Sequence, residues 1–244
     1  MRIAPLAWAL ASCGRIGLDT PARGAIDGPS STIAYVGPVA QREFGPSASD
    51  TFALQASAAG DAILVAASCN RPSAAPTTVS LAASGWSFAQ LDPITSAAHA
   101  GGGMYYAASF VAIAPDTIAT TATVTWSATC SGSSDEIGDE LAGNDPSGGA
   151  ITFDSHVVAA GFGDCTASLE TLHDDDAIWA ACFSESSLSG VGPGFTKGAD
   201  DQDGDWTEYA LAIGPAGTTD TATFANPGLT FVIEVVAIKP RSSS

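Results

Sequence analysis

Basic residues are scarce in this sequence, and their scarcity limits what the protein can bind. The chain of 244 residues carries 8 lysines and arginines against 26 aspartates and glutamates, which gives a formal net charge of −18. Such a chain repels phosphate backbones and anionic lipid headgroups, so nucleic acid is excluded as an expected partner. The surplus of carboxylates instead offers oxygen ligands to divalent cations, and Ca²⁺ is the cofactor that we expect.

Long apolar runs and the motifs of several enzyme classes are also missing. The apolar run Ile3–Ser12 has ten residues, whereas a bilayer span needs about 20. No Gly-x-Ser-x-Gly motif is present, so the usual signature of a serine hydrolase is absent. The glycine-rich stretch Ala100–Tyr105 leads into a β-prone segment and lacks the helix N-terminus that would hold a phosphate. No segment shows sustained helical periodicity, which favours an all-β fold.

The N-terminus has the layout of an export signal. Met1-Arg2 supplies a positive charge, the apolar run follows, and small residues close the segment. Leu10-Ala11-Ser12-Cys13 resembles the lipobox of bacterial lipoproteins, and the resemblance implies that Cys13 is lipidated and becomes the new N-terminus. Because Gly14 and not aspartate would come second, it also implies an outer-membrane or cell-surface address rather than retention in an inner membrane. The alternatives are a signal peptide cleaved elsewhere and a buried N-terminal segment.

The remaining cysteines, Cys69, Cys130, Cys165 and Cys182, are even in number, as expected of two disulfides in an exported chain. Four cysteines allow three pairings. Thr166–Thr171 and Ala177–Phe183 are two expected strands on either side of a turn at Leu172–Asp175, and folding them together places Cys165 opposite Cys182, within reach of a disulfide. We therefore expect Cys165–Cys182 and Cys69–Cys130.

Short β-prone segments separated by turn residues make up the rest of the chain. The sequence predicts an all-β protein, an antiparallel β-sandwich of the jelly-roll or concanavalin-like kind. We expect a signal segment at 1–13, a flexible linker at 14–30, one β-sandwich domain at 31–240 and a tail at 241–244. Besides the two strands above, the expected strands are Ser31–Val36, Thr51–Ala56, Asp61–Ser68, Thr77–Leu81, Met104–Ile113, Thr120–Thr129, Asp205–Ile213, Thr219–Phe224 and Leu229–Ile238.

An internal repeat links the two halves of the chain, because three blocks recur in the same order. Its period, near 100 residues, is too long for a solenoid. We interpret it as two pseudo-repeated halves that supply matching strands to one sandwich. The alternative is chance similarity between Ala- and Thr-rich strands. The matched blocks are Gly60–Cys69 with Asp175–Cys182, Met104–Trp126 with Trp206–Phe224, and Ile137–Asn144 with Phe231–Ile238.

The chain ends in a hydrophobic segment that closes with Lys-Pro, the stretch VVAIKP at Val235–Pro240. With the strand layout before it, this ending resembles secreted bacterial β-sandwich modules of largely uncharacterised function. The resemblance covers roughly Ser31–Pro240 and implies an extracellular adhesion or carbohydrate-binding role.

Two acidic loops are candidate metal sites. Asp201, Asp203 and Asp205 alternate around Gly204, so several carboxylate oxygens could converge on Ca²⁺. The loop is not an EF-hand, and a solvated turn between strands is the alternative. The second loop, Leu172–Ala177, adds His173 to three aspartates; a hairpin tip is its plainer interpretation, and we retain it as an alternative calcium loop.

Asp135–Glu140 is the candidate enzymatic motif. In a strand, Glu136 and Glu140 point to the same face, and paired carboxylates can run retaining glycoside hydrolysis. The stretch resembles the Glu-x-Asp-x-x-Glu strand of laminarinase-like glycoside hydrolases, but Gly138 replaces the middle acid and the final spacing is one residue short, which argues against hydrolysis. The internal repeat aligns Glu140 with Glu234, so both are alternatively structural acids.

Aromatic side chains offer a further binding hypothesis, since exposed rings stack on sugars. Trp126 and Trp179 are placed as core residues. Trp206 and Tyr105 stand at the edges of polar loops and are the candidate binding residues.

These observations predict an exported, surface-anchored or secreted, non-catalytic β-sandwich module that binds a glycan or a surface protein and is stabilised by calcium. Membrane contact is expected only through a lipid anchor. One alternative is a carbohydrate-active enzyme that uses Glu136 and Glu140, and another is a subunit of an extracellular assembly.

Overall fold

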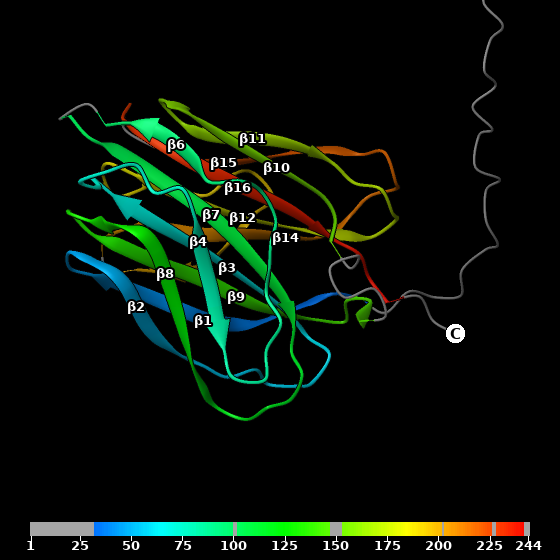
Figure 1. The fold of residues 1–244 in the computed structure, drawn as a ribbon. Coiled ribbons are helices and arrows are strands. Elements are labelled where there is room, and N and C mark those ends of the chain that lie inside the picture. Colours follow the sequence, from blue (N-terminus) through cyan, green and yellow to red (C-terminus); the bar gives the residue numbers. More distant parts are fainter. Residues whose placement is uncertain (1–31, 100–101, 147–152, 202, 226–227, 242–244) are drawn as a thin grey trace, which may run out of the picture.

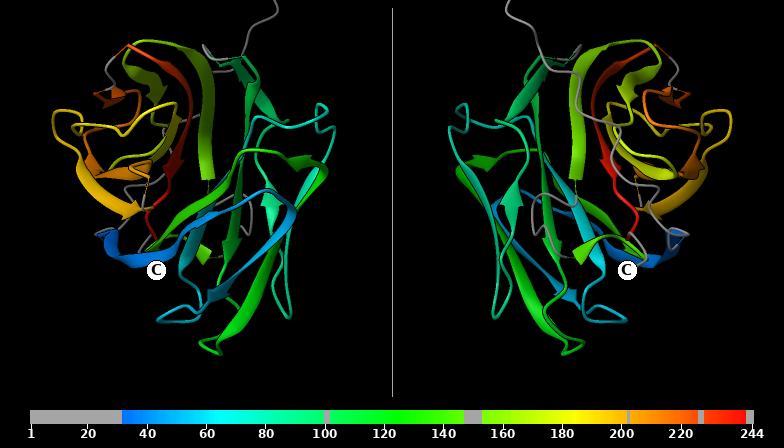
Figure 2. Two further views of the ribbon diagram at one scale, coloured as in Figure 1. Left: turned by 90° about the vertical axis from the view of Figure 1, so that its left-hand side faces the viewer. Right: turned by 90° about the vertical axis from the view of Figure 1, so that its right-hand side faces the viewer.

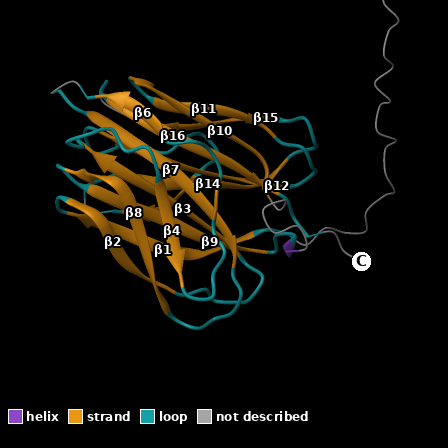
Figure 3. Cartoon of the chain, in the orientation of Figure 1, coloured by secondary structure: helices purple, strands orange, loops and turns teal. Residues whose placement is uncertain are grey.

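The computed structural model describes residues 32–99, 102–146, 153–201, 203–225 and 228–241. Strands and the turns between them account for almost all of these residues (Figure 3). The all-β prediction is therefore confirmed. The expected signal segment with Cys13 and the expected linker lie outside the described residues. Within the described ranges, no helix has the length and hydrophobicity needed to cross a lipid bilayer.

The strands divide between an N-terminal half and a C-terminal half. The N-terminal half contains β1 Ala34–Phe44, β2 Ser47–Leu54, β3 Ala62–Asn70, β4 Val79–Ala83, β5 Ala89–Gln90, β6 Thr95–Ala98, β7 Met104–Ile113, β8 Thr120–Cys130 and β9 Ser134–Ala142. The C-terminal half contains β10 Phe153–Phe162, β11 Cys165–Glu170, β12 Asp176–Ser184, β13 Thr196–Asp200, β14 Trp206–Ile213, β15 Thr219–Phe224 and β16 Thr230–Ile238.

Each half builds one large and one small sheet (Figure 1). In the N-terminal half the large sheet has the order β1-β9-β3-β7-β5, with β6 also paired to β7, and the small sheet is β2-β8-β4. In the C-terminal half the large sheet is β10-β16-β12-β14-β13 and the small sheet is β11-β15. All of these pairings are antiparallel.

The sheets stack in four layers, and the burial of β3 shows why. Alternate side chains of a strand point to opposite faces. Leu64 belongs to a central core shared with the other large sheet, whereas Ile63 and Val65 belong to a core shared with the small sheet β2-β8-β4. Trp179 and Ile178 of β12 divide in the same way between the central core and a third core against β11-β15. The two large sheets thus pack face to face, and each carries its small sheet on the outside (Figure 2).

This stacking accounts for the apolar sequences of β3 and β12. A strand covered on both faces has no water-facing side, so AILVAA of β3 and AIWAACF of β12 run continuously apolar. The β-sandwich prediction is confirmed, and the structure extends it from two layers to four. The repeat also has a structural counterpart, because β9-β3-β7 and β16-β12-β14 occupy matching positions in their sheets.

Two disulfides connect large sheets to small ones, in the predicted pairs Cys69–Cys130 and Cys165–Cys182. The hairpin predicted for the second pair is wrong. β11 and β12 do not form a hairpin, since β11 pairs with β15 while β12 pairs with β14 and β16. The turn between them carries the chain from the outer sheet to the inner one, and the disulfide crosses between these layers. Two disulfides indicate an oxidising, extracytoplasmic location.

Candidate functional site

Asp154 meets two side chains of a later turn, His173 and Asp176, where the two C-terminal sheets meet. Asp154 lies near the start of β10, at a register shift against β16 between Phe153 and Ser155. His173 lies in the turn after β11, and Asp176 begins β12 at a second register shift, against β14. Irregularities of this kind re-aim side chains out of the regular ladder and are common beside functional sites.

The geometry of this Asp154–His173–Asp176 group suits a metal ion. Each residue offers one ligand atom, and these atoms lie within 4.8 Å of one another. Nδ1 of His173 contacts Oδ2 of Asp154. Oδ2 of Asp176 accepts the backbone N–H groups of Leu172 (3.2 Å) and His173 (3.1 Å). The other oxygen of Asp176, Oδ1, is buried, and no described residue donates a hydrogen bond to it.

Two of the three side chains in this group are buried carboxylates, an environment that favours a bound cation. Asp176 has no exposed surface, and the side chain of Asp154 is 5% exposed. Burial raises the pKa of Asp176 to about 7, opposed by the His173 N–H and reinforced by the nearby Asp154. The His173 side chain is 43% exposed, so the group is open to solvent on one side. This Asp/His/Asp group could bind a divalent metal.

A second polar feature is a cavity of about 380 Å³ at one end of the two large sheets, which we call the seam cavity. Asn70, Tyr105 and Asp135 line it from the N-terminal half, and Ser184, Asp203 and Asp205 line it from the C-terminal half. It brings together three of the predicted site residues, namely Tyr105, Asp203 and Asp205, and adds Asp135.

The predicted calcium loop is more buried than a solvated turn. Oδ1 of Asp201 accepts the N–H groups of Asp203 (2.9 Å), Gly204 (2.7 Å) and Asp205 (3.0 Å) and so caps the loop itself. Gly204 has φ +95°, a conformation that favours glycine. Asp201 does not line the seam cavity, whereas Asp203 and Asp205 do. Calcium binding here stays a prediction.

The two glutamates of the candidate enzymatic motif are buried, and each accepts a hydrogen bond from a protein group. Glu136 and Glu140 are 0% and 3% exposed. Oε1 of Glu136 accepts the Ser134 hydroxyl (3.0 Å), and burial raises the pKa of Glu136 to about 8. Oε1 of Glu140 accepts the Ser57 N–H (2.7 Å). Both contacts are those of structural acids.

The predicted equivalence of Glu140 and Glu234 is wrong. Glu234 is two residues from Val232 and from Val236, so its side chain lies on the same face of β16 as theirs, the face toward the central core. Glu140 is next to Leu141, which points into that core from β9 as Ile137 does, so the side chain of Glu140 points to the opposite face. The two glutamates therefore lie on opposite faces of their strands, because an alignment that is out of register by an odd number of residues exchanges the faces.

The aromatic residues lie mostly inside. Trp126 and Trp179, at 2% and 0% exposure, are core residues as predicted. Trp206 is 7% exposed, packs in the third core and lies under the Lys197 ammonium, 4.0 Å from the ring centroid. Tyr105 is 5% exposed but lines the seam cavity. Neither candidate binding residue presents an open ring face to solvent.

Sequence patterns give little sign of Asp139 and none of Asp154. Asp139 accepts hydrogen bonds from the Tyr35 hydroxyl (2.9 Å) and Nε1 of Trp179 (2.8 Å), and in the sequence it is marked only as a charged residue in a strand with Ile137 and Leu141. Asp154 carries no signal at all, because its partners are about twenty positions away and meet it only through the packing of β10 against the β11–β12 turn.

Comparison with known proteins adds no identity: no protein-family model, no curated protein and no solved structure matches the chain.

Proposed function

We propose that the chain is an exported, non-catalytic binding module whose C-terminal half holds a divalent transition metal ion at Asp154, His173 and Asp176. The single observation that carries this proposal is the convergence of three ligand atoms within 4.8 Å around a buried carboxylate oxygen without a donor among the described residues. Without a cation, two acids share this space with one half-exposed imidazole.

The ligand set favours zinc over calcium. An imidazole nitrogen suits Zn²⁺ and its neighbours in the transition series, whereas Ca²⁺ prefers six or more oxygen ligands. Three protein ligands leave at least one coordination position for water, on the side where His173 reaches solvent. The ion ties β10 to the β11–β12 turn, and its role in this proposal is to stabilise the module.

Export and surface attachment are the finer parts of the proposal. The two disulfides support export, because such bonds persist outside the cytoplasm. Lipidation of Cys13 would hold the module at the surface. The partner that we propose is an extracellular glycan, which the resemblance of the chain to secreted bacterial β-sandwich modules implies.

Zinc binding is tested by thermal unfolding of the disulfide-bonded protein with and without Zn²⁺. A ligand present at a hundredfold excess over its Kd stabilises the folded state by about 2.7 kcal/mol. For a domain of this size that corresponds to a rise in Tm of roughly 5–10 °C. We expect the rise in the wild type and its loss in His173→Ala and Asp176→Asn.

The matched control is His156→Ala. His156 also contacts an aspartate, with Nδ1 2.7 Å from Oδ2 of Asp92, but no third His, Cys, Asp or Glu of the described ranges completes this pair. The variant is expected to keep the full zinc response. An equal response in His173→Ala and in the wild type would contradict the proposal.

A further inference from the structure

The seam cavity is lined by oxygen atoms that the protein leaves unsatisfied. They are Oδ1 of Asn70, Oδ1 of Asp135 and Oγ of Ser186; each is buried and has no hydrogen-bond partner among the described residues. A buried polar atom left without a partner destabilises the folded state, because it has lost its hydrogen bonds to water and gained none from the protein. Three of them around one cavity point to a ligand that supplies positive charge or hydrogen-bond donors.

The neighbours of Asn70 fix the orientation of its amide. The Tyr105 hydroxyl donates to the Ser184 carbonyl oxygen (3.1 Å), so its proton is already used. It therefore accepts from Nδ2 of Asn70 (3.2 Å). The carbonyl oxygen of Asn70 then points away from Tyr105 and stays available as a neutral oxygen ligand.

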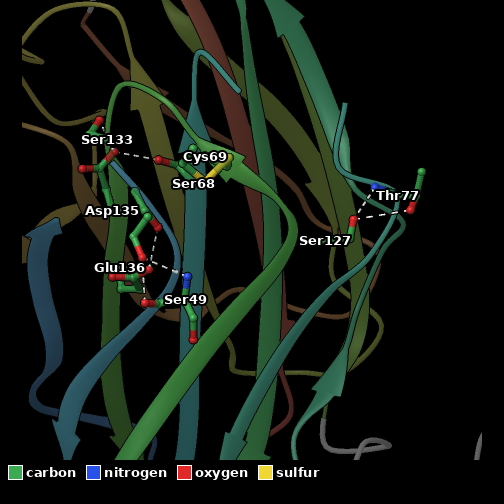
Figure 4. Close-up of a disulfide and its surroundings, with 11 residues drawn as sticks. Ser49, Ser68, Cys69, Thr77, Ser127, Ser133, Asp135 and Glu136 are labelled. Carbon is green, nitrogen blue, oxygen red and sulfur yellow. Dashed lines mark hydrogen bonds between the residues drawn. A yellow bond between two sulfur atoms is a disulfide. The ribbon is translucent and has the colours of Figure 1, made fainter. Parts of the chain in front are cut away.

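Asp135 supplies the N-terminal half's carboxylate. It is 3% exposed, and its Oδ2 accepts the Ser68 hydroxyl (2.7 Å), as Figure 4 shows beside Cys69. Burial raises the pKa of Asp135 to about 8; the Ser68 hydroxyl opposes this rise, and the charges of Asp201, Glu43 and Asp203 add to it. A bound cation would offset the part of this rise that comes from the neighbouring charges.

Asp205 supplies the matching carboxylate from the C-terminal half. It is 5% exposed, and its Oδ1 accepts the Ser184 N–H (2.9 Å). Burial raises its pKa well above the usual range, and the charges of Asp201 and Asp135 raise it further. Asp203 adds a third carboxylate to the cavity lining.

The basic groups of the cavity are engaged with one another and with an acid. Nη2 of Arg71 lies 3.1 Å from Nε2 of His99, and Nδ1 of His99 contacts Glu185. Arg71 and Glu185 therefore balance each other across His99. The charge of Asp135, Asp203 and Asp205 remains without a counterion among the lining residues.

We propose that the seam cavity binds a hard divalent cation, Ca²⁺, between Asp135 of one half and Asp205 of the other, with the Asn70 carbonyl oxygen as a further ligand, water in the remaining positions and Asp203 adding negative charge to the lining. An all-oxygen ligand set is the one that calcium prefers. This site differs from the one predicted from the loop alone: Asp201 is used to cap the loop, and Asp135 from the N-terminal half takes its place. The ion joins the two halves of the repeat, and this site is independent of the proposed zinc site.

The test is a titration of the full chain with Tb³⁺, a luminescent substitute for calcium that the ring of Tyr105 sensitises at short range. We expect saturable emission that Ca²⁺ competes away. Asp135→Asn should weaken terbium binding by roughly tenfold or more, as loss of a ligand does. Asn has the shape of the protonated Asp135 carboxyl group, so this variant is expected to fold.

The matched control is Glu234→Gln, which makes the same chemical change at an acid that is 1% exposed, has its pKa raised to about 8 by burial, and lies outside the cavity. Its terbium affinity should equal that of the wild type, and Asp205→Asn should repeat the loss seen in Asp135→Asn. Wild-type affinity in both cavity variants, or no sensitised emission, would overturn the proposal. Loss of binding in His173→Ala alone would assign the ion to the other site and overturn the seam site while leaving the zinc proposal intact.

Discussion

Asp139 links the two halves through hydrogen bonds, and replacing it should lower the free energy of unfolding. It has no exposed surface and belongs to β9, but three of its four hydrogen-bond donors come from the C-terminal half. The donors are the Tyr35 hydroxyl (2.9 Å), Nε1 of Trp179 (2.8 Å), the Ala199 N–H (2.9 Å) and the Thr207 hydroxyl.

The magnitude follows from the donors that would be left behind. In Asp139→Ala the two hydroxyls can turn toward other acceptors, but the Trp179 and Ala199 N–H groups are fixed and stay buried. Each unsatisfied donor costs about 1–3 kcal/mol. We therefore expect the free energy of unfolding to fall by about 2–6 kcal/mol. Asp139→Asn should also destabilise, because its amide NH₂ would face donors.

The assay is urea unfolding at neutral pH with the disulfides intact, followed by tryptophan fluorescence. Glu170→Gln removes a carboxylate charge at an exposed position of β11 and serves as the control, with an expected change of at most about 0.5 kcal/mol. A loss smaller than about 1 kcal/mol in Asp139→Ala, at an unchanged dependence on urea, would show that the Trp179 and Ala199 N–H groups do not depend on this carboxylate.

Two further predictions concern pH and backbone packing. Burial raises the pKa values of Asp135, Glu136 and Glu234 to about 8, above those of the unfolded chain, so the folded state binds more protons between about pH 4 and 8. Urea unfolding should therefore show greater stability at pH 5 than at pH 8, and the opposite order would contradict the assigned burial. Gly138→Ala should destabilise by about 2 kcal/mol or more, because the added Cβ would lie 2.4 Å from the Leu64 carbonyl oxygen, and unchanged thermal unfolding would show that the strands can separate there.

Much of the secondary structure could be predicted because β-branched and aromatic residues mark the strands and turn residues separate them. β7 and β15 match the expected Met104–Ile113 and Thr219–Phe224 residue for residue. The stacking could not be predicted in the same way. A continuous apolar strand such as β3 indicates burial on both faces, but it does not say which sheet covers each face.

The disulfides and the candidate metal group illustrate the same limit. The predicted pair Cys165–Cys182 is correct, but the hairpin from which it was predicted does not form. The residues on either side of a turn stay close together whether the chain folds back within one sheet or crosses from one layer to the next. His173 and Asp176 were visible in one acidic turn. Asp154 was not, because only the packing of β10 against that turn brings it within reach.

The most direct test of the account is X-ray diffraction from crystals of the protein grown with Zn²⁺, measured on both sides of the zinc absorption edge. We expect one anomalous difference peak enclosed by the carboxylates of Asp154 and Asp176 and the imidazole of His173. An absence of density at that point, or a zinc ion bound only at His156 and Asp92, would contradict it.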